Sequence, residues 1–492
     1  MDPVEPTASA WLFLAIGALL LLGVLFGRMS GRLGVPAFLL FLGAGMLAGS
    51  EGLGGIAFDD YRLAFRLGTL ALVLILFDGG LNTPLPEVRR AWAPATVLAT
   101  VGVLGTAGLM GLLVRLLGFS WSQSLLLGAV VASTDAAAVF SVLRSSGLQL
   151  RRRVGLTLEL ESGLNDPMAI LLTLALTAAV ASGGGIEGSW FFQVPLQLAV
   201  GGAFGVGIGL AGRTLLRRLT LNAGGLYAAL SMALALLAFA LPTLFWGSGF
   251  LAVYVAAALI GNSRFPYRGG LLHFHDSIAW LAQIGMFLLL GLLVFPSQLV
   301  PQAGRGLVLG LVLALVARPL VVALCLLPFR YPWRESLFLS LVGLRGAVPI
   351  VLATFPVMAG VPGAENLFHL VFFVVVVNAL VPGTAVAWLA RRLRLVSDRP
   401  PPPKAVLEIT STQWLDGEVV SYFIRPELPV CGVPLADVPL PGTARVMLIL
   451  RGNELVAPRG DTVLEEGDHV YLFCKPEDEA WLHLAFGRQE EH

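Results

Sequence analysis

Thirteen apolar stretches fill most of residues 1–403, and no other feature restricts the fold of this chain as strongly. A helix needs about 20 mainly apolar residues to cross the hydrocarbon of a membrane, and backbone in lipid must satisfy its own hydrogen bonds. The stretches therefore predict an all-α polytopic membrane protein with thirteen transmembrane helices. The first stretch lacks a basic start and is as long as a true span, so we expect it to remain uncleaved. The stretches lie at roughly 10–27, 34–50, 66–82, 93–117, 122–144, 154–180, 191–212, 223–243, 247–263, 275–295, 304–327, 333–358 and 366–390.

The proline run at 400–403 divides the chain into two parts of opposite charge. The first part has 25 Arg, no Lys and 16 acidic residues, a net charge of +9, whereas residues 404–492 have 7 basic and 15 acidic residues, a net charge of −8. We therefore expect a long apolar membrane protein joined to a short, acidic, soluble domain of the α+β class. The expected domains are residues 1–396 in the membrane, a Pro-rich linker at 397–403, a soluble domain at 404–486 and a tail at 487–492.

Composition and cysteine spacing exclude several functions. Only 13% of the residues are charged, against about 25% in an ordinary soluble protein, which argues against a secreted enzyme or a nucleic-acid-binding protein. Cys325, Cys431 and Cys474 are far apart and form no CxxC motif, so neither a disulfide framework nor a zinc site is expected. No HExxH motif and no nucleophile elbow occurs in the sequence, so we expect neither catalysis nor a cofactor.

The arginines of the apolar part indicate its orientation in the membrane. Counted over alternate loops, 19 arginines lie on one side, and only Arg62, Arg66 and Arg305 lie on the other. Loops rich in positive charge stay in the cytoplasm, so the N-terminus is expected outside and the acidic C-terminal domain inside. The odd number of spans agrees, because it places the two termini on opposite sides. We expect a multi-pass protein of the inner (plasma) membrane.

The thirteen spans divide into two halves of six, joined by a linker helix. Halves of this kind have opposite topology, as in transporters built from inverted repeats. The fifth span is interrupted at residues 133–135 and the twelfth at residues 343–349, and each is the fifth member of its half. Broken helices at matching positions are the best sequence indication of a transporter's binding site. We therefore expect two inverted six-helix repeats with broken fifth and twelfth helices.

Six charged residues lie where a span should be apolar, and such residues are functional candidates because charge inside a membrane is costly. Asp166 is followed by a proline, which frees a backbone carbonyl one turn earlier, and Ser162 adds a hydroxyl. Oxygen ligands of this kind suit a small hard cation. Glu161 faces a different neighbour, because five residues correspond to about 140° around a helix, and Arg345 is its expected ion-pair partner. The six residues are Asp78, Asp135, Glu159, Glu161, Asp166 and Arg345.

Several polar residues near the breaks have more than one interpretation. Asp135, after Thr134, is expected to neutralise the positive end of a helix, and it is also a candidate for the cation site. Helix capping or contact with water is the favoured explanation for Asp78. Glu159 is expected to face the inner end of its helix, and Arg318 to be an internal structural charge.

At these positions the sequence resembles the NhaP-type branch of the monovalent cation:proton antiporters. Three motifs, in the right order and in the right spans, carry a resemblance that covers about 390 residues. Within that branch the chain is most similar to the potassium/proton antiporters linked to cell-volume regulation. Residues 404–486 resemble the TrkA-C regulatory tail of that subgroup, with strands expected at 445–451 and 470–474. The motifs are Ser133-Thr134-Asp135-Ala136-Ala137-Ala138-Val139-Phe140, Glu161-Ser162-Gly163-Leu164-Asn165-Asp166-Pro167-Met168-Ala169 and Gly343-Leu344-Arg345-Gly346-Ala347-Val348-Pro349-Ile350.

The resemblance implies a homodimer in which a core domain moves against a dimerisation domain. It places a site shared by the proton and the cation at Asp166. It gives supporting roles to Thr134, Asp135 and Ser162, and it includes Asn165 in the site.

Two further expectations follow from the resemblance. Glu161 is paired with Arg345. Relatives with two adjacent aspartates are electrogenic, so Asn165 in the first of these positions implies electroneutral exchange of one cation per proton. A small molecule or a nucleotide is the candidate regulator at the C-terminal domain, and the sequence does not choose between them.

Competition for one carboxylate explains how such a site couples two fluxes. A buried carboxylate is neutralised by either a proton or a cation, and alternating access then yields exchange without ATP. A sodium (or lithium)/proton antiporter remains the alternative, because these motifs do not discriminate between monovalent cations. A cation channel is the alternative from another class, although a channel should show filter loops or rings of acidic residues.

Overall fold

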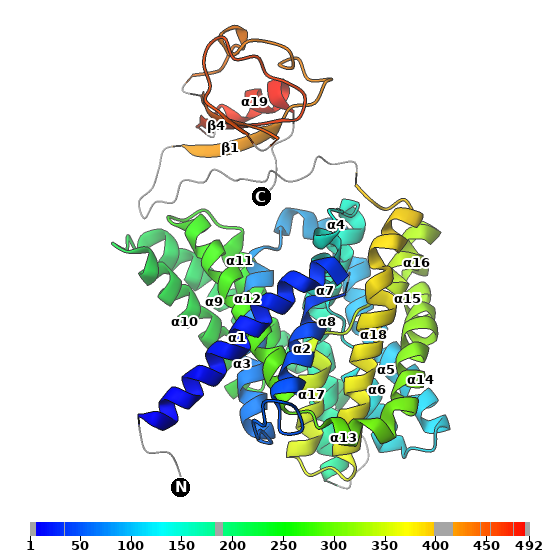
Figure 1. The fold of residues 1–492 in the computed structure, drawn as a ribbon. Helices are drawn as coiled ribbons and strands as arrows, with labels where there is room; N and C mark the ends of the chain where they lie inside the picture. The colour runs from blue at the N-terminus through cyan, green and yellow to red at the C-terminus, as the bar shows by residue number, and fades with distance from the viewer. Residues whose placement is uncertain are drawn as a thin grey trace. The chain divides into compact units, whose positions relative to one another are not determined.

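The computed structural model describes residues 6–33, 35–182, 190–397, 417–442, 444–452, 454–475 and 477–487. Within these ranges the chain forms a bundle of helices and a small sheet domain (Figure 1). Most of the expected linker at 397–403 and of the expected tail at 487–492 lies outside the described residues. The helices of the bundle are α1 (Thr7–Leu33), α2 (Ala37–Ala48), α3 (Tyr61–Leu81), α4 (Leu85–Val97), α5 (Val103–Leu116), α6 (Trp121–Val130), α7 (Ala136–Ser145), α8 (Arg152–Ala181), α9 (Trp190–Arg218), α10 (Gly224–Leu244), α11 (Gly249–Gly261), α12 (Arg268–Leu292), α13 (Pro296–Leu299), α14 (Ala303–Val312), α15 (Arg318–Leu326), α16 (Trp333–Leu341), α17 (Ala347–Met358) and α18 (Ala364–Arg392).

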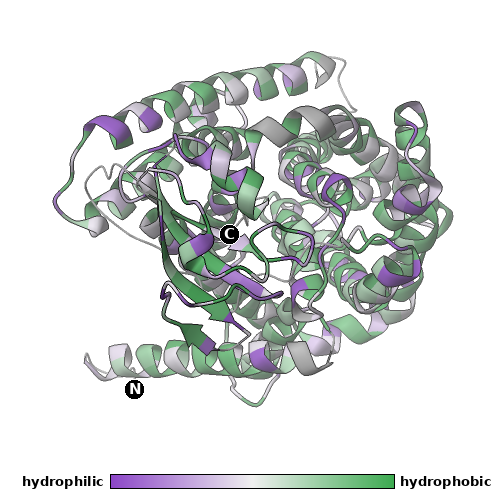
Figure 2. Cartoon of the chain, turned by 90° about the horizontal axis from the view of Figure 1, so that it is seen from above, coloured by the Kyte–Doolittle hydropathy of each residue, from purple (hydrophilic) through white to green (hydrophobic). Residues whose placement is uncertain are grey.

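Nine helical segments within the described ranges are long and apolar enough to cross a membrane. Two of these segments are composite, because α4 and α5 join through a π-helical turn at Leu98–Gly102, and α13, α14 and α15 also run on as one segment. The other four expected spans consist of shorter helices, namely α2, α11 and the pairs α6–α7 and α16–α17. The prediction of an all-α polytopic membrane protein is confirmed. Figure 2 shows α1, beside the N label, to be hydrophobic along most of its length.

The fifth and twelfth spans are broken where the sequence predicts. Residues 131–135 separate α6 from α7, and residues 342–346 separate α16 from α17. Both breaks are almost entirely buried, so their backbone groups need partners inside the protein. By contrast, α8 continues without interruption through Pro167. The interior therefore holds two non-helical segments beside one continuous helix.

Close helix contacts hold α8 and its neighbours in place. The helix packs against α4, α6, α11 and α17. In α11 itself, a side chain at Gly261 would collide with the backbone of Leu81 in α3. A Cβ on Gly80 would come within 2.7 Å of the Tyr254 carbonyl oxygen. Glycine at both positions lets α3 and α11 approach each other closely, as interfaces between membrane helices commonly do.

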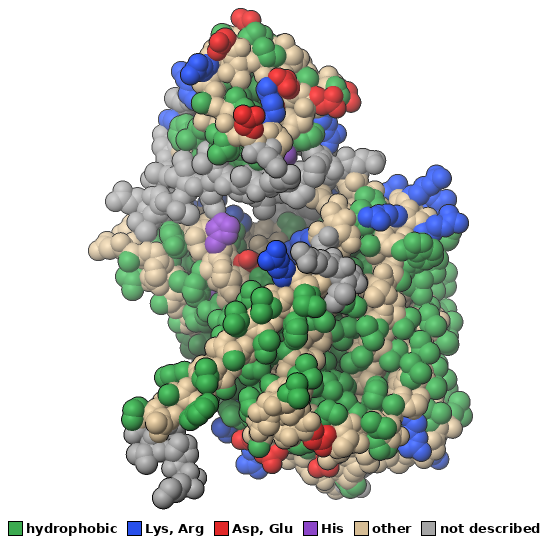
Figure 3. All heavy atoms as spheres, viewed as in Figure 1, with side chains coloured by type: hydrophobic (Ala, Val, Ile, Leu, Met, Phe, Trp, Pro, Cys, Tyr) green, Lys and Arg blue, Asp and Glu red, His purple; other side chains and the backbone are tan. Residues whose placement is uncertain are grey.

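The outer surface of the bundle matches a membrane protein. In Figure 3 hydrophobic side chains cover the middle of the bundle, and basic side chains gather at the end where α16 begins and α18 ends. Arg391 and Arg392 lie in the last turn of α18.

Two compact units can be distinguished, one of residues 1–214, 229–263 and 274–397, the other of residues 215–228, 264–273 and 398–492.

The C-terminal domain contains a four-stranded antiparallel sheet in the order β1-β4-β2-β3. The predicted strands at 445–451 and 470–474 are confirmed as β2 and β4, while β3 has only three residues and was not expected. The side chains of Tyr422, Ile449 and Leu472 are buried in its core together with Phe486. The strands are β1 (Glu418–Phe423), β2 (Arg445–Arg451), β3 (Glu454–Val456) and β4 (Asp468–Cys474), followed by the helix α19 (Glu479–Phe486).

Candidate cation-binding site

The two breaks touch each other inside the bundle. The backbone N–H of Asp135 donates a hydrogen bond of 2.8 Å to the carbonyl of Leu344. Gly346 lies against the Asp135 carboxylate, and a side chain at this glycine would collide with it. The absence of a side chain at Gly346 therefore allows the acidic residue of one break to lie directly on the other break.

Charged side chains neutralise helix ends at this contact. The Asp135 carboxylate accepts a hydrogen bond from the N–H of Ala138 at 3.1 Å and so caps the N-terminus of α7. Arg345 is fully buried and donates from Nη1 to the carbonyls of Ala132 and Ser133, just beyond the end of α6. A negative charge at a helix N-terminus and a positive charge at a C-terminus are both favourable. The expected capping role of Asp135 is therefore present in the structure.

Two polar side chains of α8 fasten that helix to the first break. The Ser162 hydroxyl donates to the carbonyl of Thr134 at 2.9 Å and accepts from the N–H of Ala136 at 3.1 Å. The Asn165 amide donates to the Thr134 hydroxyl at 2.6 Å. The two Ser162 bonds satisfy backbone groups that the break leaves without helical partners. They also bring the predicted residues of α8 and of the fifth span into one cluster.

Asp166 is the buried carboxylate of this cluster, with 7% of its surface exposed. Its Oδ1 atom is buried, and no hydrogen bond from the described residues reaches it. Asp135 and Arg345 are both close enough to act on it electrostatically. Pro167 follows and has no N–H to donate to the carbonyl of Gly163, so a backbone oxygen one turn away also lacks its helical partner. A small cation would find oxygen ligands here.

Glu161 forms a different ion pair from the one expected. Its Oε1 lies 2.6 Å from Nη1 of Arg318 on α15, and the two side chains are 1% and 5% exposed. No ion pair joins Glu161 to Arg345 among the described residues. Arg318 reaches Glu161 because it passes over Gly343, where any side chain would collide with its guanidinium. Arg345 is instead directed at the carbonyls after α6.

The one sequence signal for the true partner was the position of Arg318 in the middle of a span. That residue was predicted to be an internal structural charge, which agrees with its place in the structure. Its partner Glu161 lies 157 positions earlier in the chain, and no motif connects the two. The sequence therefore indicates both residues of the pair, whereas Arg345 as the predicted partner of Glu161 is wrong.

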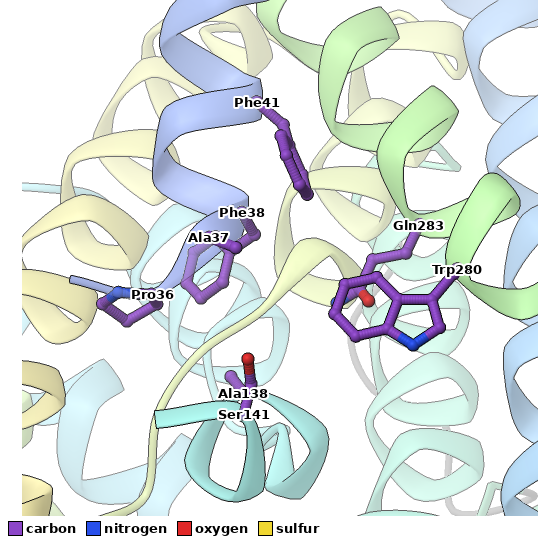
Figure 4. A pocket seen from close by; sticks show the side chains of 8 residues that line it. All are labelled: Pro36, Ala37, Phe38, Phe41, Ala138, Ser141, Trp280 and Gln283. Carbon is purple, nitrogen blue, oxygen red and sulfur yellow. The ribbon is translucent and has the colours of Figure 1, made fainter. Parts of the chain in front are cut away.

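A small cavity lies beside α7, about one turn from Asp135 (Figure 4). Ala138 and Ser141 of α7 line one side, and Trp280 and Gln283 of α12 face them. Residues 36–41, at the start of α2, close the remaining side. The backbone N–H of Ala138, one of the lining residues, donates to the Asp135 carboxylate.

Two broken helices in contact, with a buried carboxylate beside them, are typical of a membrane transporter. The model for the transmembrane part of sodium/hydrogen exchangers matches residues 17–392, and the TrkA-C domain model matches residues 419–485. The chain belongs to the sodium/hydrogen exchanger family.

Curated relatives match almost the whole chain. It is 42% identical over 469 residues to the K(+)/H(+) antiporter NhaP of Alkalimonas amylolytica, a match that covers 94% of this chain and 81% of that protein. It is 43% identical over 467 residues to the K(+)/H(+) antiporter NhaP2 of Shewanella oneidensis, covering 93% and 80% respectively. The solved structure of the sodium proton antiporter MjNhaP1 from Methanocaldococcus jannaschii superimposes with a TM-score of 0.68 at 23% identity. That match covers 78% of this chain and 99% of the other, and it shows a shared fold.

Proposed function

We propose that the protein exchanges potassium ions for protons across the plasma membrane by secondary active, electroneutral antiport. The observation that carries this proposal is Asp166, a buried carboxylate with an unpartnered oxygen beside two broken helices. The names of relatives that are 42% and 43% identical support potassium as the cation. The alternative cation is sodium or lithium, for which the same oxygen ligands are suitable.

The mechanism follows from the cost of an isolated charge in a membrane interior. Asp166 binds either a proton or a partly dehydrated cation, and each neutralises the carboxylate. An unloaded site carries a net charge whose burial is costly, so it does not change its exposure from one side to the other. Only loaded sites move, and this couples the two fluxes. Asn165, a neutral residue, supports exchange of one cation per proton.

Four neighbours complete the proposed site. Thr134 and Ser162 bridge the first break to α8, and Asn165 holds the Thr134 hydroxyl. Asp135 caps α7 and also adds a carboxylate near Asp166. Glu161 and Arg345 have structural roles, the first through Arg318 and the second through carbonyls after α6.

The orientation and assembly are also part of the proposal. The excess of 19 loop arginines over three supports an N-terminus outside the cell and a cytoplasmic C-terminal domain. The exposed apolar surface of α1, which includes Trp11 and Phe13, supports burial in lipid or against a second subunit of a homodimer. The TrkA-C match supports a regulatory role for residues 419–485, with a small molecule or a nucleotide as the ligand.

Exchange in reconstituted liposomes tests the proposed function. Vesicles with an acidic interior and an internal pH dye receive potassium, sodium or lithium in turn. The wild-type protein should alkalinise them with potassium, at a rate that does not change when the membrane potential is clamped. Asp166→Asn should abolish the response, whereas Asp59→Asn, in an exposed loop before α3, should retain it.

Two results would contradict the proposal, the first its mechanism and the second antiport itself. Coupled exchange that persists in Asp166→Asn would remove the carboxylate from the mechanism. A potassium flux that builds a membrane potential without moving protons would identify a channel instead.

A further inference from the structure

Glu159 is an acidic residue of α8 that has no role in the proposed mechanism. It is partly buried, two turns from the end of α8 that begins at Arg152. Within the described ranges, no hydrogen bond or ion pair reaches its carboxylate. A charge kept in a protein interior without a partner lowers stability. In a membrane protein such a residue is a functional candidate.

Apart from Asp166, which the proposed mechanism uses, three other acidic residues of the bundle have partners among the described residues. Glu161 pairs with Arg318, and Glu335 lies 3.8 Å from Arg153. Even Asp78, near the end of α3, accepts a hydrogen bond from a neighbouring asparagine at 3.1 Å. Glu159 therefore differs from these residues in having no structural task that explains its charge.

The position of Glu159 relates it to the candidate cation site. Asp166 follows it by seven residues, which is two turns of helix, so both side chains lie on the same face of α8 about 10 Å apart along the axis. Gly163 lies between them on that face. Its carbonyl lacks a helical donor, because residue 167 is a proline. A carboxylate, a carbonyl without its usual donor four residues on and a second carboxylate thus follow one another along the helix.

Tyr254 of α11 occupies the space that a side chain at Gly163 would fill. A Cβ on Gly163 would come within 2.7 Å of Cε2 of this buried tyrosine. The Tyr254 ring therefore lies against the backbone of α8 between the two carboxylates. Any larger residue at position 163 would separate α8 from α11.

The Tyr254 hydroxyl can act as an acceptor on this face, because its proton is used in a hydrogen bond to Thr83. Its oxygen is 3.1 Å from the hydroxyl of Thr83, whose own proton is donated to the carbonyl of Gly79 at 2.8 Å. Tyr254 must therefore be the donor in the bond to Thr83, and its remaining lone pairs can accept a cation. Glu159 is close enough to act electrostatically on this hydroxyl.

We propose that Glu159 is a second cation-binding residue, at which the transported monovalent cation binds transiently, with the Tyr254 oxygen, before it passes along α8 to Asp166. The inference rests on the proposed antiport function. A carboxylate at this position raises the local concentration of cations and not of anions. The Gly163 carbonyl lies between the two acidic residues and supplies an oxygen ligand on the way.

Steady-state exchange kinetics in proteoliposomes test the role of Glu159. Glu159→Gln should raise the KM for potassium about three- to tenfold, because it removes one full charge from the route. Its maximal rate should stay within about twofold of wild type, because Asp166 is intact. Glu159→Asp should give an intermediate KM. The matched control is Glu365→Gln, an exposed carboxylate in the first turn of α18, and its KM should not change.

Ionic strength and a second variant make the test independent of folding defects. Added choline chloride should raise the KM of the wild type more than that of Glu159→Gln, since salt screens the charge that the variant lacks. If Glu159→Gln does not assemble, Tyr254→Phe, which keeps the ring and removes the oxygen, must raise the KM by itself.

Three outcomes would overturn the inference. The first is an unchanged KM in Glu159→Gln, and the second is a fall in maximal rate alone, which indicates a structural role. The third is an assembled Glu159→Asp that behaves like the glutamine variant. These results are distinct from failure of the proposed function, in which the wild-type protein itself shows no exchange of potassium for protons and both conclusions fall.

Discussion

At the scale of single residues, Glu161 and Arg318 hold opposite charges deep in the bundle, at 2.6 Å from each other. Removing one partner of a buried ion pair leaves a charge without compensation, at a typical cost of about 3–5 kcal/mol. We expect Glu161→Leu to lower the unfolding temperature in detergent markedly. The double variant Glu161→Leu/Arg318→Leu should recover most of the loss, because two apolar side chains of similar size need no partner. Thermal unfolding followed by size-exclusion chromatography measures both.

The same set of single and double variants, with Arg345 in place of Arg318, is the control for the pairing. Arg345 donates to carbonyls of residues 132 and 133, so Glu161→Leu/Arg345→Leu should be less stable than either single variant. Recovery in this second double variant, and not in the first, would mean that Glu161 stabilises Arg345.

At the scale of elements, the packing of α2 depends on Gly45 and not on Gly43, which lies two residues earlier. A Cβ on Gly45 would collide with the Leu288 carbonyl and lie 2.8 Å from the Cα of Gly291, both in α12, whereas a Cβ on Gly43 would meet nothing within 4 Å. Gly45→Ala should therefore destabilise the bundle by about 1–3 kcal/mol through overpacking. Gly43→Ala should be neutral or slightly stabilising, since alanine is the better helix former.

The unfolding temperatures of the two variants test the α2–α12 contact directly, because the substituted residues are only two positions apart on one helix. Equal temperatures for Gly45→Ala and Gly43→Ala would contradict it.

Elements were more predictable than the contacts between them. The breaks at residues 131–135 and 342–346 follow from local chemistry, because glycine, proline and polar residues inside an apolar span disfavour a continuous helix. The membership of the candidate site was also predictable, since Asp166 and its neighbours are polar residues within otherwise apolar spans. The partner of Glu161 was not predictable, because Arg318 and Arg345 are both in-span arginines and only the packing of α15 over Gly343 decides between them.

The roles of Gly163 and Tyr254 could not be predicted for the same reason. Glycine and tyrosine are common in apolar spans, and their contact between α8 and α11 joins positions 91 residues apart. Strand β3 has three residues, which is too short for an alternating pattern to appear.

At the scale of the whole molecule, the two charge-distinct parts of the chain are stabilised in different ways. The bundle exposes large apolar side chains such as Phe13 and Trp388, which require lipid or a second subunit to cover them. The C-terminal domain buries its own apolar residues on one sheet and one helix. Asp468, a buried carboxylate of the sheet, is bound by Arg451 at 2.8 Å. We therefore expect the acidic domain to fold in water without the bundle.

Expression of residues 404–492 alone tests this independence. We expect a soluble protein with dispersed amide resonances and a cooperative thermal transition, because Val420, Ile449 and Leu472 form its core together with the buried face of α19. Arg451→Met leaves Asp468 buried without its partner and should lower the transition temperature by roughly 5–15 °C. Arg445→Met, on the same strand but with an exposed side chain, is the matched control and should have little effect.

The pH dependence of the isolated domain tests whether the stabilisation by Arg451 persists over the range in which the arginine stays charged. Hydrogen bonds from Arg451 to Asp468 raise the pKa of the arginine above its ordinary value. A base whose pKa is raised on folding contributes its stability fully below the pKa of the unfolded state, and loses it only as the pH rises through the folded value. The contribution of Arg451 should therefore be constant between pH 6 and 9, and the difference between wild type and Arg451→Met should not change over this range. A difference that disappears by pH 9 would mean that Arg451 does not stabilise the domain through its charge.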